Sequence, residues 1–222
     1  MRSRRFPSPT GSARAVRHPK STVKYGAARL RSVVRKPSRP TPETAFPLFS
    51  PFRDSRGKTL RWYQPSALHR YHELSDGDRL YATLRWVETF GSLARVESSE
   101  GVFTLKRRGF LRPYVSVRDA GLGTDLAVLR PNFLSGGTLT FSDGRQLTFT
   151  SARFWGFEWS FRNEGGMVIC SVRLRSTIRD SGNVVVPVEV KHDKALLVTI
   201  AAAYYTMVMA NDEAAVIAAG AA

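Results

Sequence analysis

The feature that most constrains this chain is a stretch near its C-terminus, residues 195–210, that is apolar on almost every side. Only Thr199 and Thr206 in it are conventionally polar, and the polar residues 211–213 end the apolar run. A helix that is hydrophobic all round must be surrounded by protein or by lipid. The run of 16 residues makes about 24 Å of helix, whereas a bilayer core of about 30 Å usually needs about 20 residues.

We therefore expect a helix over residues 195–210 that is buried inside the protein. The alternative is a tail anchor that inserts into a membrane. The residues that follow, 214–220, are expected to form either a second short helical piece, capped by Asn211 or Asp212, or a frayed tail.

The region before this stretch, from Leu60 onward, consists of short segments in which apolar and polar residues alternate. Turn dipeptides such as Asp76-Gly77 and Asp143-Gly144 separate them, a spacing typical of an all-β sandwich or barrel. An eight-stranded barrel is filled by its own side chains, so a barrel that encloses a helix needs more strands. The sequence therefore predicts an all-β fold with one C-terminal helix: a closed antiparallel β-barrel of about 12 strands around the hydrophobic helix.

Positive charge is concentrated at the N-terminus. The net charge is +16, and residues 1–60 hold 15 Lys/Arg against 2 Asp/Glu, whereas residues 61–222 hold 19 against 16. We expect residues 1–58 to be a disordered basic arm rich in Arg, Ser and Pro, and residues 59–222 to be the barrel domain. An organelle-targeting peptide, a polyanion-binding tail and a misplaced translation start are alternatives for the arm.

The residues that commonly carry out chemistry form no recognisable constellation in this sequence. His69 and His72 lie three apart in an extended region, which places their side chains on opposite faces of a strand. Cys170 is the single cysteine and lies in an apolar run, so we expect a small buried hydrophobic side chain. No catalytic residues, cofactor or metal site are expected, and the protein is expected not to be an enzyme.

Several segments resemble the Tubby C-terminal domain superfamily, which includes LURP-one-related proteins and phospholipid scramblases. They are residues 60–71 (LRWYQPSALHRY), 82–86 (ATLRW), 91–94 (GSLA) and 204–209 (YYTMVM), which look like uncharacterised bacterial members. The resemblance covers roughly residues 60–213 and implies a barrel around a central helix. It also implies binding of phosphoinositides or a link to lipid movement. Residues 180–183 (DSGN) lack the repeated carboxylates that calcium prefers, so no calcium site is expected.

Two groups of basic residues are the candidate lipid-phosphate ligands of the domain. They are Lys106, Arg107, Arg108 and Arg112 along one predicted hairpin, and Arg173 and Arg175, which alternate onto one strand face. Each cation near an anionic membrane contributes about 1 kcal/mol of attraction. Ordinary solvated charges are the alternative interpretation of both groups.

The expected function is a non-enzymatic barrel module that binds phosphoinositides or other acidic phospholipid headgroups, in a cytoplasmic protein peripheral to the membrane. One alternative is a structural or protein-interaction domain without a lipid ligand. Another is nucleic-acid binding through the arm, whose affinity would fall steeply with salt. No specific nucleic-acid partner is expected for the nearly neutral domain.

Overall fold

The computed structural model describes residues 48–89, 91–132, 136–151, 158–175 and 179–220. Most of the predicted arm, residues 1–47, therefore lies outside the described residues. The elements in chain order are η1 (a 3-10 helix, Phe52–Ser55), β1 (Leu60–Tyr63), β2 (Tyr71–Ser75), β3 (Leu80–Trp86), β4 (Leu93–Ser98), β5 (Gly101–Arg108), β6 (Tyr114–Asp119), β7 (Asp125–Asn132), β8 (Gly136–Phe141), β9 (Gln146–Ser151), β10 (Glu158–Arg162), β11 (Val168–Arg175), β12 (Ser181–Val185) and α1 (Lys194–Gly220).

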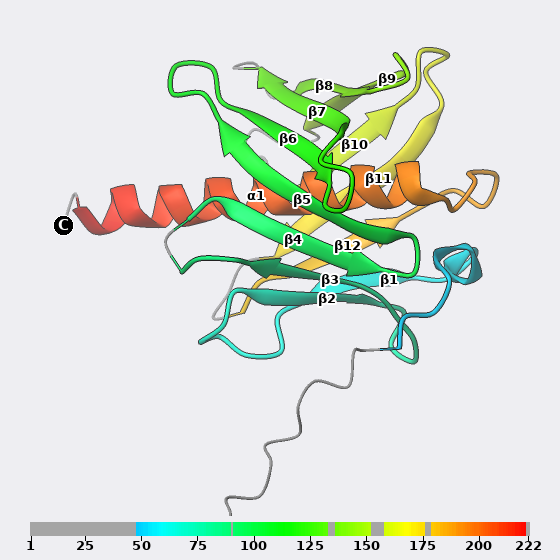
Figure 1. The fold of residues 1–222 in the computed structure, drawn as a ribbon, viewed down its shortest axis with the longest axis horizontal. Helices are drawn as coiled ribbons and strands as arrows, with labels where there is room; N and C mark the ends of the chain where they lie inside the picture. Colours follow the sequence, from blue (N-terminus) through cyan, green and yellow to red (C-terminus); the bar gives the residue numbers. More distant parts are fainter. Residues whose placement is uncertain (1–47, 90, 133–135, 152–157, 176–178, 221–222) are drawn as a thin grey trace, which may run out of the picture. The chain divides into compact units, whose positions relative to one another are not determined.

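The strands form a closed antiparallel barrel in which each strand pairs with its neighbours in sequence, and β1 pairs with β12 to close the ring. Closure leaves no unpaired strand edge, so every strand is protected from pairing with another chain. Helix α1 runs through the ring of strands (Figure 1). The predicted all-β class, strand number, closure and enclosed C-terminal helix are confirmed.

Alternating burial along the strands creates the apolar lumen that receives the helix. In β9, for example, Leu147 and Phe149 are buried while their neighbours Gln146 and Thr148 are exposed. Successive side chains of a strand point to opposite faces, so the apolar set lines the interior. Tight turns keep the register, and Gly77 and Gly144 occupy left-handed conformations (φ 104° and 89°) that other residues rarely adopt.

The helix begins where the sequence suggests, because Asp193 caps it. The Asp193 carboxylate accepts a hydrogen bond from the Leu196 N–H at 3.1 Å. Within the apolar stretch, the Thr199 and Thr206 hydroxyls donate to the carbonyl oxygens four residues earlier, at 2.9 and 2.7 Å. These bonds satisfy the polar atoms that an apolar lumen cannot solvate.

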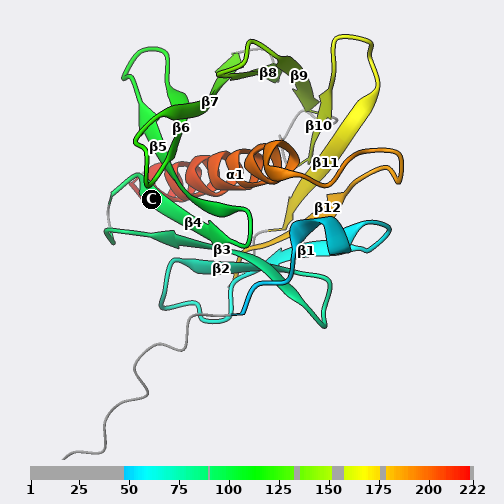
Figure 2. The same cartoon turned by 45° about the vertical axis from the view of Figure 1, so that its right-hand side comes forward.

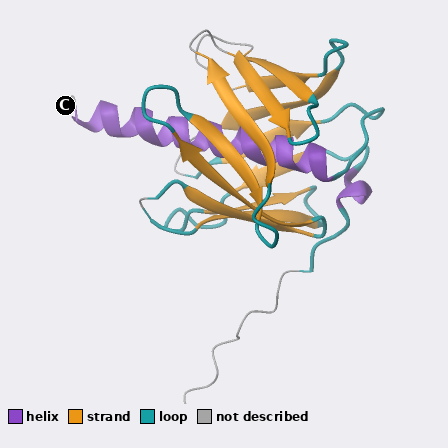
Figure 3. Ribbon diagram, turned by 45° about the horizontal axis from the view of Figure 1, so that its top comes forward, coloured by secondary structure: helices purple, strands orange, loops and turns teal. Residues whose placement is uncertain are grey.

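The expected end of the helix at residue 210 is wrong, as is the expected second piece or frayed tail. Helix α1 continues without a break to Gly220 (Figure 3). The polar residues 211–213 end the apolar surface, but they do not end the backbone hydrogen bonding. The alanine-rich stretch that follows has high helix propensity, and the next glycine is Gly220 itself.

By length and composition, α1 could cross a membrane, and the tail-anchor alternative rests on that property. In this structure, however, 67% of the most apolar stretch of 18 residues in α1 is buried inside the protein. The core helix of a folded domain meets the same criteria, so the length and composition of α1 are weak evidence for a membrane span. Figure 2 shows the strands on all sides of its first half.

Two consecutive tyrosines attach the helix to β1 and β3, the two strands that flank β2 in the barrel wall. Tyr204 stacks on Trp62 with ring centroids 5.1 Å apart, and Tyr205 stacks on Trp86 at 5.5 Å. All four side chains are at most 6% exposed. Offset stacked aromatic pairs contribute about 0.5–1.5 kcal/mol beyond their buried area, so these pairs help to set the rotation of α1 in the lumen.

The boundary expected between residues 58 and 59 lies too late in the chain. Phe52 is fully buried in the same core as the strands, and its ring stacks on His192 at 5.5 Å. Ser55 is also fully buried, and its hydroxyl lies 2.7 Å from His192 Nδ1. Residues 52–55 therefore belong to the barrel domain, where η1 packs beside the start of α1.

We expect the substitution Gly182→Ala to destabilise the domain by about 1–3 kcal/mol through overpacking. A Cβ at this position in β12 would lie 2.7 Å from the Tyr204 ring, which is itself held against Trp62. The matched control is Gly121→Ala, whose Cβ would make an ordinary contact at 3.5 Å. Urea unfolding of both variants measures the difference, and equal midpoints would show that Tyr204 can move aside freely.

Candidate functional site

The barrel has two ends, and we name the end at which α1 leaves it the exit mouth. Because adjacent strands are antiparallel, the connections after β1, β3, β5 and the other odd-numbered strands lie at one end. Strand β5 fixes which end this is, since Gly101 at its start lies near Lys194, at the start of α1. The N–H of Arg107 near its end donates to the Tyr205 hydroxyl at 3.2 Å. We name the opposite end the entry mouth.

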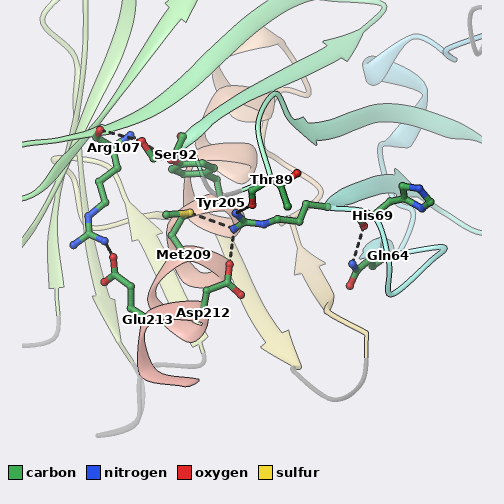
Figure 4. A network of polar contacts seen from close by, with 10 residues as sticks. Gln64, His69, Thr89, Ser92, Arg107, Tyr205, Met209, Asp212 and Glu213 are labelled. Carbon is green, nitrogen blue, oxygen red and sulfur yellow. Dashed lines mark hydrogen bonds and ion pairs between the residues drawn. The ribbon is translucent and has the colours of Figure 1, made fainter. Parts of the chain in front are cut away.

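Two ion pairs hold the helix where it leaves the barrel (Figure 4). Arg70, at the end of the β1–β2 connection, pairs with Asp212, and Arg107 pairs with Glu213. The Arg70 guanidinium also lies 4.4 Å from the centre of the Trp86 ring, a cation–π contact. Burial raises the pKa of Asp212, and the positive charge of Arg70 opposes that shift.

Tyr205 joins the helix to two strands at this end (Figure 4). Its hydroxyl donates to the backbone oxygen of Ser92 and accepts from the backbone N–H of Arg107. Burial is the main reason that the pKa of this phenol is raised, so the group is neutral at physiological pH. At the exit mouth, therefore, a polar frame of ion pairs and hydrogen bonds joins α1 to the β1–β2 connection, to Ser92 and to Arg107 near the end of β5.

Exposed apolar side chains surround this frame. Phe110 and Leu111, at the tip of the β5–β6 hairpin, are 96% and 81% exposed, and Leu68 in the β1–β2 connection is 90% exposed. Val216 and Ile217, on the part of α1 that projects from the barrel, are each 72% exposed. The entry mouth also has exposed apolar side chains, such as Leu122 and Val188, but two adjacent large ones such as Phe110 and Leu111 at a hairpin tip commonly mark a surface that contacts a membrane or another protein.

The predicted basic residues of the β5–β6 hairpin do come to the exit mouth, but they do not act as one group. Lys106, Arg108 and Arg112 are exposed, and no carboxylate among the described residues pairs with any of them. The side chain of Arg107 points to the other face of β5, toward α1, where it forms an ion pair with Glu213. Three of these four cations are thus available to an external anion.

The second predicted group lies on the opposite wall of the barrel. Arg173 and Arg175 are exposed on the outside of β11, and six strand steps separate β11 from β5 in either direction round the ring. Arg173 pairs with Glu158 on the neighbouring strand, with one hydrogen bond of 2.7 Å. The structure therefore does not bring the two predicted groups into a single phosphate site.

Carboxylates gather at the other end of the barrel. Among the described connections, those at the entry mouth carry Asp76, Asp78, Glu100, Asp143, Glu164, Glu189 and Asp193, whereas those at the exit mouth carry Glu88 and Asp180. Both acidic residues at the projecting end of α1 are neutralised by arginines. An anionic surface is therefore repelled less at the exit mouth than at the entry mouth.

The groups that resemble catalytic residues are buried structural ones. Ser55 and His192 form a close pair, but they are 0% and 6% exposed, and the Ser55 hydroxyl also lies 2.7 Å from the Phe52 carbonyl oxygen. Cys170 is fully buried, as expected, and burial raises the pKa of its thiol to about 12. No cluster of three or more potential metal ligands occurs in the part of the chain that the structure describes.

Sequence reasoning missed the residues that hold the exit mouth together. Arg70 and Asp212 are 142 positions apart, and Ser92 and Tyr205 are 113 apart, so no local pattern relates them. The exposed pair Phe110-Leu111 was detectable, because two large apolar residues next to Gly109 in a turn have no strand pattern to explain them. No known family model, curated protein or solved structure matches this chain.

Proposed function

We propose that this protein is a non-catalytic barrel module that binds acidic phospholipid membranes through its exit mouth. The observation that carries the proposal is the β5–β6 hairpin, whose tip presents Phe110 and Leu111 beside three exposed cations that no carboxylate of the described residues pairs with. Apolar side chains at a membrane surface gain by entering the acyl region, while neighbouring cations stay at the level of the headgroup phosphates. The barrel around a helix also fits the plan of the Tubby-like superfamily that the sequence resembles.

The charge of the hairpin favours an acidic membrane over a neutral one. Lys106, Arg108 and Arg112 together supply about 3 kcal/mol of attraction at about 1 kcal/mol per cation near an anionic surface. That attraction is screened by salt, whereas the contribution of Phe110 and Leu111 is not. Binding through this face should therefore need both the acidic lipid and the apolar tip.

We expect the double substitution Phe110→Ser and Leu111→Ser to weaken binding to acidic vesicles by at least about tenfold, because it removes two side chains that bury apolar area. Co-sedimentation with vesicles of phosphatidylcholine and phosphatidylglycerol, and with vesicles that also contain a phosphoinositide, measures this. The matched control is Leu122→Ser at the entry mouth, a turn leucine that is 80% exposed.

The full chain, with its basic residues 1–47, is present in every variant, so the comparison isolates the hairpin. Equal binding by the double variant and the control would contradict the proposal. It would also favour the N-terminal basic residues as the source of vesicle affinity. No binding of the natural chain at low salt would favour a structural or protein-interaction role instead.

A further inference from the structure

We propose that the exit mouth contains a binding site for a single acyl chain, in a cavity between α1 and the strands β6, β7 and β10. The proposal deepens the proposed function and rests on it, because it names the part of an acidic lipid that the barrel would receive. The cavity has a volume of about 190 Å³.

The lining of this cavity is mostly apolar and comes from both the helix and the wall. Its walls include Tyr114, Pro131 and Trp159 on the barrel side and Met209 and Ala210 on the helix side. An apolar cavity lined by aromatic and flexible thioether side chains suits a flexible hydrocarbon. The larger cavity at the entry mouth, about 460 Å³, also has apolar lining residues, but the carboxylates of Glu164, Glu189 and Asp193 line it as well and disfavour an anionic headgroup.

The volume limits how much of a chain can enter. A methylene group fills about the same space as a water molecule in the liquid, about 30 Å³. A cavity of about 190 Å³ therefore accommodates about six methylene groups at that volume each. The site would take the end of a lipid chain, or a short-chain amphiphile, and not a whole long chain.

Exposed cations adjoin residues of the cavity lining in the chain. Pro113, which lines the cavity, follows the exposed Arg112 directly and belongs to the same hairpin as Phe110 and Leu111. Arg107 and Glu213 lie at the cavity as an ion pair, so they add no net charge there. Arg130, likewise exposed, directly precedes the lining residue Pro131, and no carboxylate among the described residues pairs with Arg112 or Arg130, which favours a phosphate headgroup over a cationic one.

The test uses alkyl phosphates as soluble monomers, measured by calorimetric titration of the full chain. Each added methylene should raise affinity about fourfold while it is being buried. We expect affinity to rise from butyl to hexyl phosphate and to level off by octyl and dodecyl phosphate. A continued rise to dodecyl phosphate, or no binding of octyl phosphate, would overturn the acyl site and needs no variant.

A variant that fills the cavity locates the site. Ala210 lines the cavity and is otherwise exposed, so Ala210→Trp should occupy the space and lower octyl phosphate affinity at least about 30-fold, the loss of two to three buried methylenes. Ala215→Trp adds the same side chain on the projecting part of α1, outside the lining, and should leave octyl phosphate affinity unchanged. Unchanged affinity in Ala210→Trp would overturn the proposal.

Vesicle binding separates this inference from the proposed function. If acidic vesicles bind the natural chain and octyl phosphate does not, the membrane face stands and the acyl site is wrong. If octyl phosphate binds the natural chain but not Ala210→Trp, while acidic vesicles bind both, the two proposals are supported together. If neither ligand binds the natural chain, both are overturned.

Discussion

The substitution Ala202→Asp is expected to unfold the domain or bring it close to unfolding. Ala202 is fully buried in the middle of the enclosed part of α1, where a short carboxylate side chain cannot reach solvent. An uncompensated buried charge costs about 3–5 kcal/mol, which is comparable to the whole stability of many domains, about 5–15 kcal/mol. Urea unfolding followed by circular dichroism measures the loss.

The same helix provides a matched control for that experiment. Ala215 is exposed on the projecting part of α1, so Ala215→Asp makes the same chemical change without burying a charge. Its cost should be about 1 kcal/mol, from helix propensity and from an acidic group near the C-terminal end of a helix. Equal losses in the two variants would show that residues around 202 are not enclosed by the barrel in solution.

The second large effect is a loss of stability in mild acid, caused by His72. This imidazole is 1% exposed, and its Nδ1 lies 2.9 Å from the Tyr204 hydroxyl. Burial, with a smaller contribution from the nearby Arg70 charge, lowers the pKa of His72 from 6.5 to about 4. The folded state therefore resists protonation that the unfolded state accepts.

The direction of the effect follows from that difference. Above pH 6.5 the imidazole is neutral in both states and costs nothing, whereas between pH 6.5 and about 4 mainly the unfolded state binds the proton. The free energy of unfolding should therefore fall by about 2.5 kcal/mol between pH 7.5 and pH 4.5 because of this group. Below pH 4 the contribution of His72 levels off.

Urea unfolding at both pH values tests this, with a double variant as the reference. His72→Leu combined with Tyr204→Phe removes the titrating group and its hydrogen-bond partner together, so neither member of the pair is left buried without the other. Other groups that titrate in this range, such as His192, remain in both proteins. The natural chain should lose about 2.5 kcal/mol more than the double variant, and equal losses would show that His72 does not titrate in this way.

The tertiary structure decided which of the predicted basic residues are available to a ligand. Lys106, Arg107 and Arg108 are consecutive, and strand geometry alone requires Arg107 to point away from its two neighbours. Strand geometry does not say what lies on that face. The fold places α1 there, with the carboxylate of Glu213, which is 106 positions later in the chain, paired with Arg107. The separation of Arg173 from the hairpin likewise follows from strand order, which is not a local property.

Local patterns by themselves determined the class of fold. An apolar run that is hydrophobic all round has to be enclosed, and alternating segments with turn glycines have to form strands with one buried face. Together these two requirements predict a barrel around a helix. They depend on the period of the sequence and on burial of apolar area, and both are properties of a short stretch of chain.

The extent of the core and the candidate site depended on contacts between distant residues. Phe52 ends a short apolar stretch, residues 46–52, that has no strand or helix pattern, and its place in the core comes from its contacts with His192 and Tyr81. Beyond residue 210, α1 is joined to the barrel by the ion pairs of Arg70 with Asp212 and of Arg107 with Glu213. Contact energies of this kind arise only once the chain has brought remote residues together, so the tertiary structure alone decides which segments join the core and which side chains meet at the exit mouth.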